Sequence, residues 1–425
     1  TITTDKNGFA QSKALPYGLY SVKQVGGKPG YKYVTPFDVT IKDNAPTTPI
    51  PYIIENTILH NIVRIVKVDA ESGEVIPQAG VKFKVKDSEG NWVVQKMLYP
   101  TPVEIDTFET AEDGRLTLPE PLRYGKYQLY EVSSPEPYLL KEDPIEFEIA
   151  DESISEIEIV VENEIVKGKI DIHKSGEMFV GVNEEKMDDG TNVVKHPVFE
   201  ERPLAGVELE IIAAEQIKSG DGVVHAEKGD VVQTIVTGNS ESNLSDELYL
   251  GRYIVRESKT VDGFILDDKE YEVDLQYADD KTPIVIETIS IKNERADIAV
   301  ELVKDKEIFN ASGKYEYQPG AGFTFALIAK EALYGVDNED SPLIKPGDIL
   351  SLVVTDADGK ATFKDDVPYS SKYVVKELSA PSPDYKIDPK EYPIDLSFKQ
   401  DTPTLKIKIN EGESIKNELI KVPIQ

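Results

Sequence analysis

The sequence predicts an all-β protein made of domains in tandem. Four tyrosine-rich strands recur along the chain, and each is followed 32 to 40 residues later by an apolar strand that ends in asparagine. Short turns such as AEDG (111–114) and DADG (356–359) separate alternating strands, whereas helical periodicity is scarce. The period exceeds 100 residues, so it matches the size of a domain rather than that of a solenoid repeat.

The recurring strands divide the chain into four parts. The tyrosine-rich strands are YSVKQ (20–24), YQLYE (127–131), YIVRE (253–257) and YVVKE (373–377), and the apolar endings are IIEN (53–56), VVEN (160–163), SIKN (290–293) and SIKN (414–417). They predict an incomplete domain over 1–61, called segment 1, and complete domains over 62–166, 167–296 and 297–425, called repeats 2, 3 and 4. The connections are short, with 11 residues from Asn163 to Lys174 and 11 from Asn293 to Lys304. We therefore expect a stiff, elongated rod.

Strand parity places polar side chains on the apolar faces of these strands. Successive side chains of a strand point to opposite faces, so Glu131 shares a face with Tyr127 and Leu129. The same count turns inward the glutamates Glu257 and Glu377 and the asparagines Asn56, Asn163, Asn293 and Asn417. Each complete repeat also opens with a strand whose apolar face ends in lysine, at Lys67, Lys174 and Lys304.

A buried lysine, glutamate and asparagine are costly unless they satisfy one another. Burial lowers the pKa of a lysine from about 10.4 and raises that of a glutamate from about 4.3, which favours the neutral forms. A neutral amine is a nucleophile, and a protonated carboxyl can polarise the carboxamide and move protons as ammonia leaves. The product is a lysine–asparagine amide, which forms once and without a cofactor.

The segments YQLYEVSSPEPY (127–138), YIVRESKTVDGF (253–264) and YVVKELSAPSPDY (373–385) resemble the box Y-x-L-x-E-x-x-x-P-x-G-Y of a known family. This family is the collagen-adhesin B-type (CnaB, prealbumin-like, pilin-type) domains of Gram-positive surface proteins, and the resemblance covers nearly the whole chain. It implies Ig-like or prealbumin-like β-sandwiches with a self-formed lysine–asparagine bond between first and last strands and a catalytic glutamate. The second box lacks the proline, and the third is one residue longer with aspartate in place of glycine, but both changes lie outside the reacting triad.

The resemblance assigns one triad to each complete repeat, in the order lysine nucleophile, glutamate proton shuttle and asparagine acyl donor. The triads are Lys67, Glu131 and Asn163 in repeat 2, Lys174, Glu257 and Asn293 in repeat 3, and Lys304, Glu377 and Asn417 in repeat 4.

Segment 1 departs from this pattern. Its start, TITTDKNGF (1–9), aligns with stretches that come late in repeats 2 and 4, so it resembles the C-terminal half of a domain. Gln24 replaces the box glutamate and no inward lysine precedes it, so we expect no bond to Asn56 within this chain. The chain also ends in LIKVPIQ (419–425) without an LPxTG-like sorting motif. We therefore expect this sequence to be part of a longer protein.

Composition excludes several functional classes. The chain has no cysteine, which argues against a disulfide framework, and its net charge of −31 repels nucleic acid and anionic membranes. It has no apolar run long enough to insert into a membrane. Its four histidines, His60, His173, His196 and His225, lack the spacing of a zinc site. We expect no metal, no cofactor and no enzyme activity beyond single-turnover, autocatalytic bond formation.

These observations predict an extracellular protein of the cell wall or cell surface. The first interpretation is a structural stalk segment of a cell-wall-anchored adhesin or pilus-associated protein, with sortase acting on the parent protein. The alternative of a sortase-polymerised pilus shaft subunit requires a reactive lysine in a Y-P-K context. Here Tyr99-Pro100 is followed by Thr101, and Tyr392-Pro393 by Ile394.

A third interpretation is a receptor-binding head. The longest insertion, Ser175–Pro203 in repeat 3, contains the acidic, turn-rich stretch NEEKMDDGTN (183–192) and could contact a host extracellular-matrix or cell-surface ligand. The simpler interpretation of this insertion is an exposed decoration, because only some long loops are functional.

Overall fold

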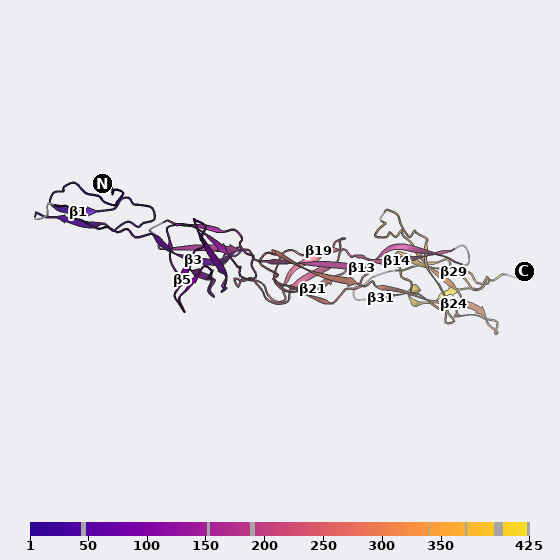
Figure 1. The fold of residues 1–425 in the computed structure, drawn as a ribbon. Coiled ribbons are helices and arrows are strands. Elements are labelled where there is room, and N and C mark those ends of the chain that lie inside the picture. The colour runs from indigo at the N-terminus through magenta and orange to yellow at the C-terminus, as the bar shows by residue number, and fades with distance from the viewer. Residues whose placement is uncertain are drawn as a thin grey trace. The chain divides into compact units, whose positions relative to one another are not determined.

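The computed structural model describes residues 1–43, 48–150, 154–187, 192–338, 340–369, 372–394 and 403–422. In these residues the regular structure is almost entirely β-strand, and the one helical element is the short 3-10 helix η1 (Ile409–Gly412) (Figure 1). The prediction of an all-β fold is confirmed. The chain forms two compact units: unit 1 is Thr1–Lys167, Lys218–His225 and Tyr277–Val285, and unit 2 is Gly168–Ile217, Ala226–Gln276 and Ile286–Gln425.

Two main sheets of repeat 2 enclose an apolar core. Its strands are β3 (His60–Asp69), β4 (Lys82–Asp87), β5 (Gln95–Met97), β6 (Val103–Ile105), β7 (Phe108–Glu109), β8 (Arg115–Thr117), β9 (Leu122–Arg123), β10 (Gly125–Glu131), β11 (Ile145–Ile149) and β12 (Glu156–Asn163). One sheet has the order β11-β10-β4-β7 and the other β12-β3-β8. Val63 and Ile65 from β3 and Phe83 from β4 are fully buried in the core. The alternation of apolar and polar residues therefore has its expected effect: one face of each sheet is buried and the other is exposed.

The first and last strands of repeat 2 lie side by side. β3 and β12 pair in parallel, and the register puts Val161 opposite Lys67 and Asn163 opposite Asp69. Asn163 thus lies two residues beyond the position facing Lys67, on the same side of the sheet. Repeat 4 has the same relationship, since β32 pairs in parallel with β24 and Ile415 lies opposite Lys304.

Repeat 3 has the same kind of four-stranded sheet, in the order β18-β15-β21-β22. Its strands are β13 (Lys167–Lys186), β14 (Val193–Pro203), β15 (Glu208–Ala213), β16 (Ile217–Lys218), β17 (Val224–Ala226), β18 (Val231–Val236), β19 (Ser242–Leu244), β20 (Leu248–Tyr249), β21 (Gly251–Lys259), β22 (Glu270–Leu275) and β23 (Ile284–Asn293). β19, β20 and β23 all pair with β13. The lysine-bearing strand is therefore the centre of the second layer.

Repeat 4 follows the same plan. Its strands are β24 (Asp297–Phe309), β25 (Tyr315–Pro319), β26 (Thr324–Ala329), β27 (Ile349–Val354), β28 (Lys360–Phe363), β29 (Tyr373–Ser379), β30 (Glu391–Ile394), β31 (Thr404–Lys408) and β32 (Ile415–Asn417). One sheet runs β27-β26-β29-β30, and β24 pairs with β25, β28, β31 and β32.

The insertion of repeat 3 is a β-hairpin rather than an exposed decoration. β13 and β14 pair from Ser175↔Pro203 to Lys186↔Val193, and residues 188–191 of the acidic stretch lie outside the described part of the chain. β14 also pairs with β27 of repeat 4 at Val194↔Ile349. Phe179 is only 7% exposed and belongs to the core of repeat 4. The expectation of a decoration was wrong because the insertion carries apolar residues that repeat 4 covers.

Segment 1 has little regular structure. Its strands β1 (Gly18–Val22) and β2 (Phe37–Ile41) form a two-stranded ribbon. No described residue before Leu59 is buried, and the Ile53 side chain is 90% exposed. A two-stranded ribbon has no second layer against which to bury its apolar side chains.

Candidate functional site: three buried lysine–glutamate–asparagine triads

The structure brings the predicted triad of repeat 2 together in the core. Lys67 Nζ donates a hydrogen bond to Glu131 Oε1 at 2.6 Å, and Asn163 Nδ2 donates one to Glu131 Oε2 at 2.8 Å. The three side chains are buried. Glu131 thus bridges the amine and the carboxamide.

The triad of repeat 3 makes a closed set of contacts. Lys174 Nζ donates to Asn293 Oδ1 and lies 2.8 Å from Glu257 Oε2. Asn293 Nδ2 donates to Glu257 Oε1 at 2.7 Å. Here the amine contacts the carboxamide oxygen directly, next to the carbon that the lysine must attack.

Repeat 4 has the same closed arrangement. Lys304 Nζ donates to Glu377 Oε2 at 2.9 Å and also to Asn417 Oδ1, and Asn417 Nδ2 donates to Glu377 Oε1. The three residues come from strands β24, β29 and β32, which are far apart in sequence. The fold therefore unites the same three functional groups three times.

Burial shifts the charges toward the neutral forms. Loss of hydration lowers the pKa of Lys67 to about 8, although Glu131 opposes this shift. Desolvation likewise lowers the pKa of Lys174 and that of Lys304. It also raises the pKa of Glu377, again against the opposing effect of its lysine partner. Neutral amine and protonated carboxyl are the states that nucleophilic attack and proton transfer require.

Aromatic rings form part of the surroundings of two lysines. Lys67 Nζ is 5.8 Å from the centre of the Phe83 ring. Lys304 Nζ is 4.8 Å from the Phe323 ring centre and 5.7 Å from that of Phe325. These rings replace water around the amine, which is the physical reason for the lowered pKa.

Glycine turns hold the lysine strands in place. Lys67 N donates to Gly114 O at 3.1 Å, and Lys304 N donates to Gly359 O at 2.7 Å. Both glycines have positive φ, and a Cβ on Gly114 would lie 2.0 Å from Ile76 O. Only glycine fits this turn, because it has no Cβ to clash and adopts positive φ without strain.

The sequence interpretation missed the further groups that form hydrogen bonds with the asparagine and the glutamate of the triads. In repeat 2, Leu139 O accepts from Asn163 Nδ2 at 2.6 Å, and Lys141 N donates to Glu131 Oε2 at 2.8 Å. In repeat 3, Thr260 Oγ1 takes the place of the carbonyl and accepts from Asn293 Nδ2 at 2.7 Å. Backbone groups cannot be recognised from the residue types, because every residue has them. Thr260, in contrast, is a polar side chain within the box segment YIVRESKTVDGF (253–264) and is visible in the sequence.

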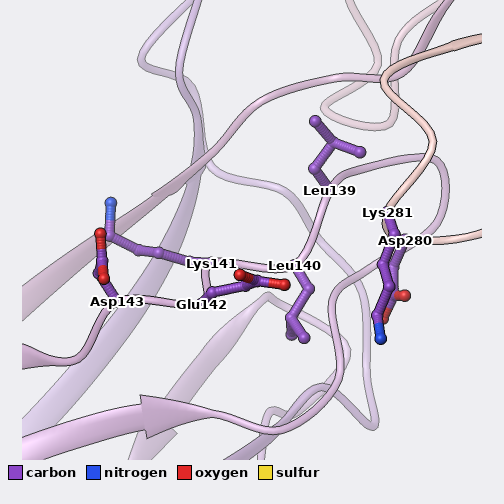
Figure 2. Close-up of a pocket in the computed structure, with 7 residues that line it drawn as sticks. All are labelled: Leu139, Leu140, Lys141, Glu142, Asp143, Asp280 and Lys281. Carbon is purple, nitrogen blue, oxygen red and sulfur yellow. The ribbon is translucent and has the colours of Figure 1, made fainter.

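The same loop of repeat 2 lines an open surface pocket (Figure 2). Its lining residues are Leu139, Leu140, Lys141, Glu142, Asp143, Asp280 and Lys281. Acidic and basic side chains share the lining, and no triad side chain is among these residues. The triad of repeat 2 therefore does not open into this pocket.

The recurring tyrosines have a structural role that the sequence did not reveal. Tyr127 Oη donates to Arg123 O at 2.9 Å, and Tyr253 Oη donates to Tyr249 O at 2.6 Å. Tyr20 makes the same bond to Pro16 O at 2.8 Å, and Tyr373 bonds to Pro368 O. Each hydroxyl satisfies a carbonyl four or five residues upstream and so holds the strand that carries the box glutamate or, in segment 1, the strand β1 that precedes Gln24.

Segment 1 keeps part of the triad geometry without a lysine. Asn56 Nδ2 donates to Gln24 Oε1 at 2.9 Å and to Lys32 O at 2.8 Å, and Val34 N donates to Gln24 Oε1 at 3.0 Å. These bonds match those among Asn163, Glu131 and the loop of repeat 2. Gln24 has no acidic proton to transfer, as the sequence interpretation argued.

Other functional sites are not evident in the described residues. They contain no group of three or more histidine, cysteine, aspartate or glutamate side chains placed to hold a metal ion. No helix among them has the length and apolar character needed to span a membrane.

Comparison with known proteins agrees with this fold. The SpaA family, described as a prealbumin-like fold domain, matches residues 61–165, 191–292 and 316–413. These domains are structural and non-enzymatic. No curated protein is similar enough in sequence to be matched.

Several solved structures of bacterial proteins match this chain. The Bacillus anthracis TIE protein is 17% identical with a TM-score of 0.52, and the alignment covers 98% of this chain and 66% of that chain. The major pilin subunit of Bacillus cereus is 13% identical with a TM-score of 0.30, covering 85% of this chain and 100% of that one. A minor pilin of Streptococcus agalactiae is 18% identical with a TM-score of 0.21, covering 56% and 96%.

The chain thus spans 66% of the TIE protein, and at this identity the likeness concerns the fold alone. The family match covers most of the chain and agrees with the resemblance seen in the sequence. This protein belongs to the SpaA family of prealbumin-like fold domains and carries three copies of that domain in tandem.

Proposed function

We propose that this chain is a structural stalk segment of a cell-wall-anchored Gram-positive adhesin or pilus-associated protein. Its repeats, 62–166, 167–296 and 297–425, act as separate domains, each closed by a self-formed lysine–asparagine isopeptide bond. Segment 1 contributes the C-terminal half of a further domain. The stalk lies outside the cell, and sortase acts on the parent protein.

One observation carries this proposal. In repeats 3 and 4 the buried amine contacts the asparagine carboxamide oxygen while the glutamate contacts both partners. The neutral amine attacks the carboxamide carbon, and the N–C bond forms as the C–NH2 bond breaks. The glutamate takes the proton from the amine and gives one to the leaving group, so that amide and ammonia are the products.

Such bonds suit a stalk for a mechanical reason. Pulling force enters a repeat through its first strand and leaves through its last, and in repeat 2 these are the paired strands β3 and β12. A covalent bond between them transmits the load directly and shields the hydrogen bonds of the rest of the domain. Repeats 2, 3 and 4 then resist both shear and proteolysis.

Single-molecule stretching tests the stalk function. The chain is held at its two ends and pulled, and repeats 2, 3 and 4 are expected to contribute no unfolding steps. The triple variant Lys67→Ala, Lys174→Ala and Lys304→Ala should add up to three steps of domain size. Domain-sized unfolding steps in the unchanged protein would rule out a load-bearing role for these bonds.

The receptor-binding alternative assigns the insertion to ligand contact, and the fold of its described residues favours a contact with repeat 4 instead. Most of Ser175–Pro203 forms the hairpin that packs on repeat 4. The pilus-shaft alternative still lacks a lysine after Tyr99-Pro100 or Tyr392-Pro393.

A further inference from the structure

Repeats 3 and 4 carry equivalent hairpins directly after the triad lysine. In repeat 3 the hairpin starts after Lys174 and ends at Pro203, where Leu204 N donates to Lys174 O at 2.9 Å. In repeat 4 it starts after Lys304 and ends at Pro319, where Gly320 N donates to Lys304 O at 2.8 Å. The same backbone bond closes both hairpins, so their positions can be compared rung by rung.

The two hairpins hold an aromatic pair on the same rung. Phe179 lies opposite Phe199 with ring centres 5.9 Å apart, and Phe309 lies opposite Tyr315 with ring centres 5.0 Å apart. Phe179 and Phe309 each follow their lysine by five residues.

A cation from the end of each repeat covers the second ring of the pair. The Arg295 guanidinium lies 3.4 Å from the centre of the Phe199 ring, and Lys421 Nζ lies 3.9 Å from that of Tyr315. Arg295 and Lys421 follow the last strands β23 and β32. The chain therefore leaves each of these repeats alongside the aromatic pair.

The surroundings of the two pairs differ. Repeat 4 covers Phe179, which is 7% exposed, and Val336 N donates to Phe179 O at 2.9 Å. Phe309 is 60% exposed and Tyr315 is 51% exposed. The pair in repeat 3 is a docking contact for repeat 4. The pair in repeat 4 has the same arrangement, but no domain packs against it in the described residues.

Unit 1 contains a similar forward contact. The turn after Lys67 includes Ser72, whose Oγ donates to Asp221 Oδ2 at 2.5 Å. Asp221 lies in the loop between β15 and β18, and Val336 lies in the corresponding loop between β26 and β27. In both cases the turn or hairpin after the triad lysine contacts the same loop of the next repeat.

We propose that Phe309 and Tyr315 form a docking surface for a further prealbumin-like domain that directly follows repeat 4 on the same polypeptide. That domain presents the loop between the first and second strands, in chain order, of its four-stranded sheet, as repeat 4 does toward repeat 3 with the loop between β26 and β27. Burial of the aromatic pair supplies the driving force. The proposal does not depend on whether the isopeptide bonds form.

A tryptophan probe tests this surface while keeping its aromatic character. The chain has one tryptophan, so the variant Trp92→Phe with Tyr315→Trp reports on position 315 alone. The same variant is made with a second copy of residues 297–422 joined after Lys421. The added copy is expected to shift the emission of Trp at position 315 to shorter wavelength and to reduce its quenching by acrylamide at least threefold.

Matched controls calibrate the readout. In the Trp92→Phe background, Phe199→Trp should be protected in the unextended chain, and Tyr17→Trp should stay accessible with or without the extension. Resistance of the added copy to trypsin shows that it is folded. If the copy alone does not fold, residues 167–422 are added instead, because repeat 4 then keeps the hairpin on which it packs.

Equal quenching at position 315 with and without a folded extension would overturn the proposal. Protection in the unextended chain that increases with protein concentration would also overturn it, because a second copy of the chain would then occupy the surface.

Discussion

Lys304 Nζ and Glu377 Oε2 lie 2.9 Å apart in the core of repeat 4, and both side chains are 0% exposed. Because the pair is buried away from solvent, each member depends on the other and on Asn417. Removing one partner of a buried pair costs about 3–5 kcal/mol, because the other is left without compensation. The triads are therefore sensitive to single substitutions.

Glu377→Ala should prevent bond formation in repeat 4 alone. The variant loses the group that moves protons between Lys304 and Asn417, so its intact mass should exceed that of the unchanged protein, after correction for the substitution, by one ammonia molecule. The matched control is Glu391→Ala, since Glu391 pairs with Lys330 at the surface. A corrected mass equal to that of the unchanged protein would show that Glu377 is dispensable.

Asn163→Ala should expose the titration of Lys67. Without its acyl donor Lys67 stays a free amine, and burial lowers its pKa to about 8 in the folded state from an ordinary 10.5. Between these values the unfolded state binds the extra proton, so the stability of the variant rises with pH across this window and falls as pH drops toward 8. The expected gain is on the order of 3 kcal/mol, measured from urea unfolding midpoints.

Two proteins serve as controls for this pH dependence. Adding Lys67→Met to Asn163→Ala removes the amine, so the stability of this double variant should not rise with pH. The stability of the unchanged protein should not rise either, because the Lys67 nitrogen is then part of an amide. A rise of the same size in all three proteins would assign it to other groups.

Lys174→Met should weaken repeat 3 by removing its crosslink. Methionine fills the space of the lysine stem without an unpaired charge, so the loss of stability of repeat 3 reports mainly on the missing crosslink. Lys174 and Asn293 are 119 residues apart in sequence, and closing a loop of this size is worth about 4–5 kcal/mol in the chain-entropy account of disulfides. Trypsin should cleave repeat 3 of this variant at lower temperature than repeat 3 of the control Lys292→Met, which replaces a partly exposed lysine.

Phe179→Ala should destabilise repeat 4, although Phe179 belongs to repeat 3. Its ring is part of the repeat 4 core, and removing a buried phenylalanine costs about 3–5 kcal/mol. Amide hydrogen exchange in β27 should therefore accelerate. Phe309→Ala is the matched control, because Phe309 holds the same place in an exposed hairpin, and it should leave β27 unchanged. Equal protection of β27 in both variants would contradict a packing role for the repeat 3 hairpin.

The sequence predicted the all-β fold because strand alternation and turn residues are local signals. Parity also selected the side chains that meet in the core, such as Lys174 and Asn293, since the faces of a strand follow from counting alone. The place of the hairpin at Phe179 could not be predicted in this way, because it depends on pairing between β14 and β27, which are distant in sequence. Backbone partners such as Leu139 O could not be predicted from the sequence either, because every residue type carries the same carbonyl.

Intact mass spectrometry of the denatured chain tests the central claim most directly. Closure of all three triads predicts a mass lower than that calculated from the sequence by three ammonia molecules, with segment 1 contributing none because Asn56 faces Gln24 rather than a lysine. A mass equal to the calculated value would contradict self-formed crosslinks and leave three buried but unreacted triads.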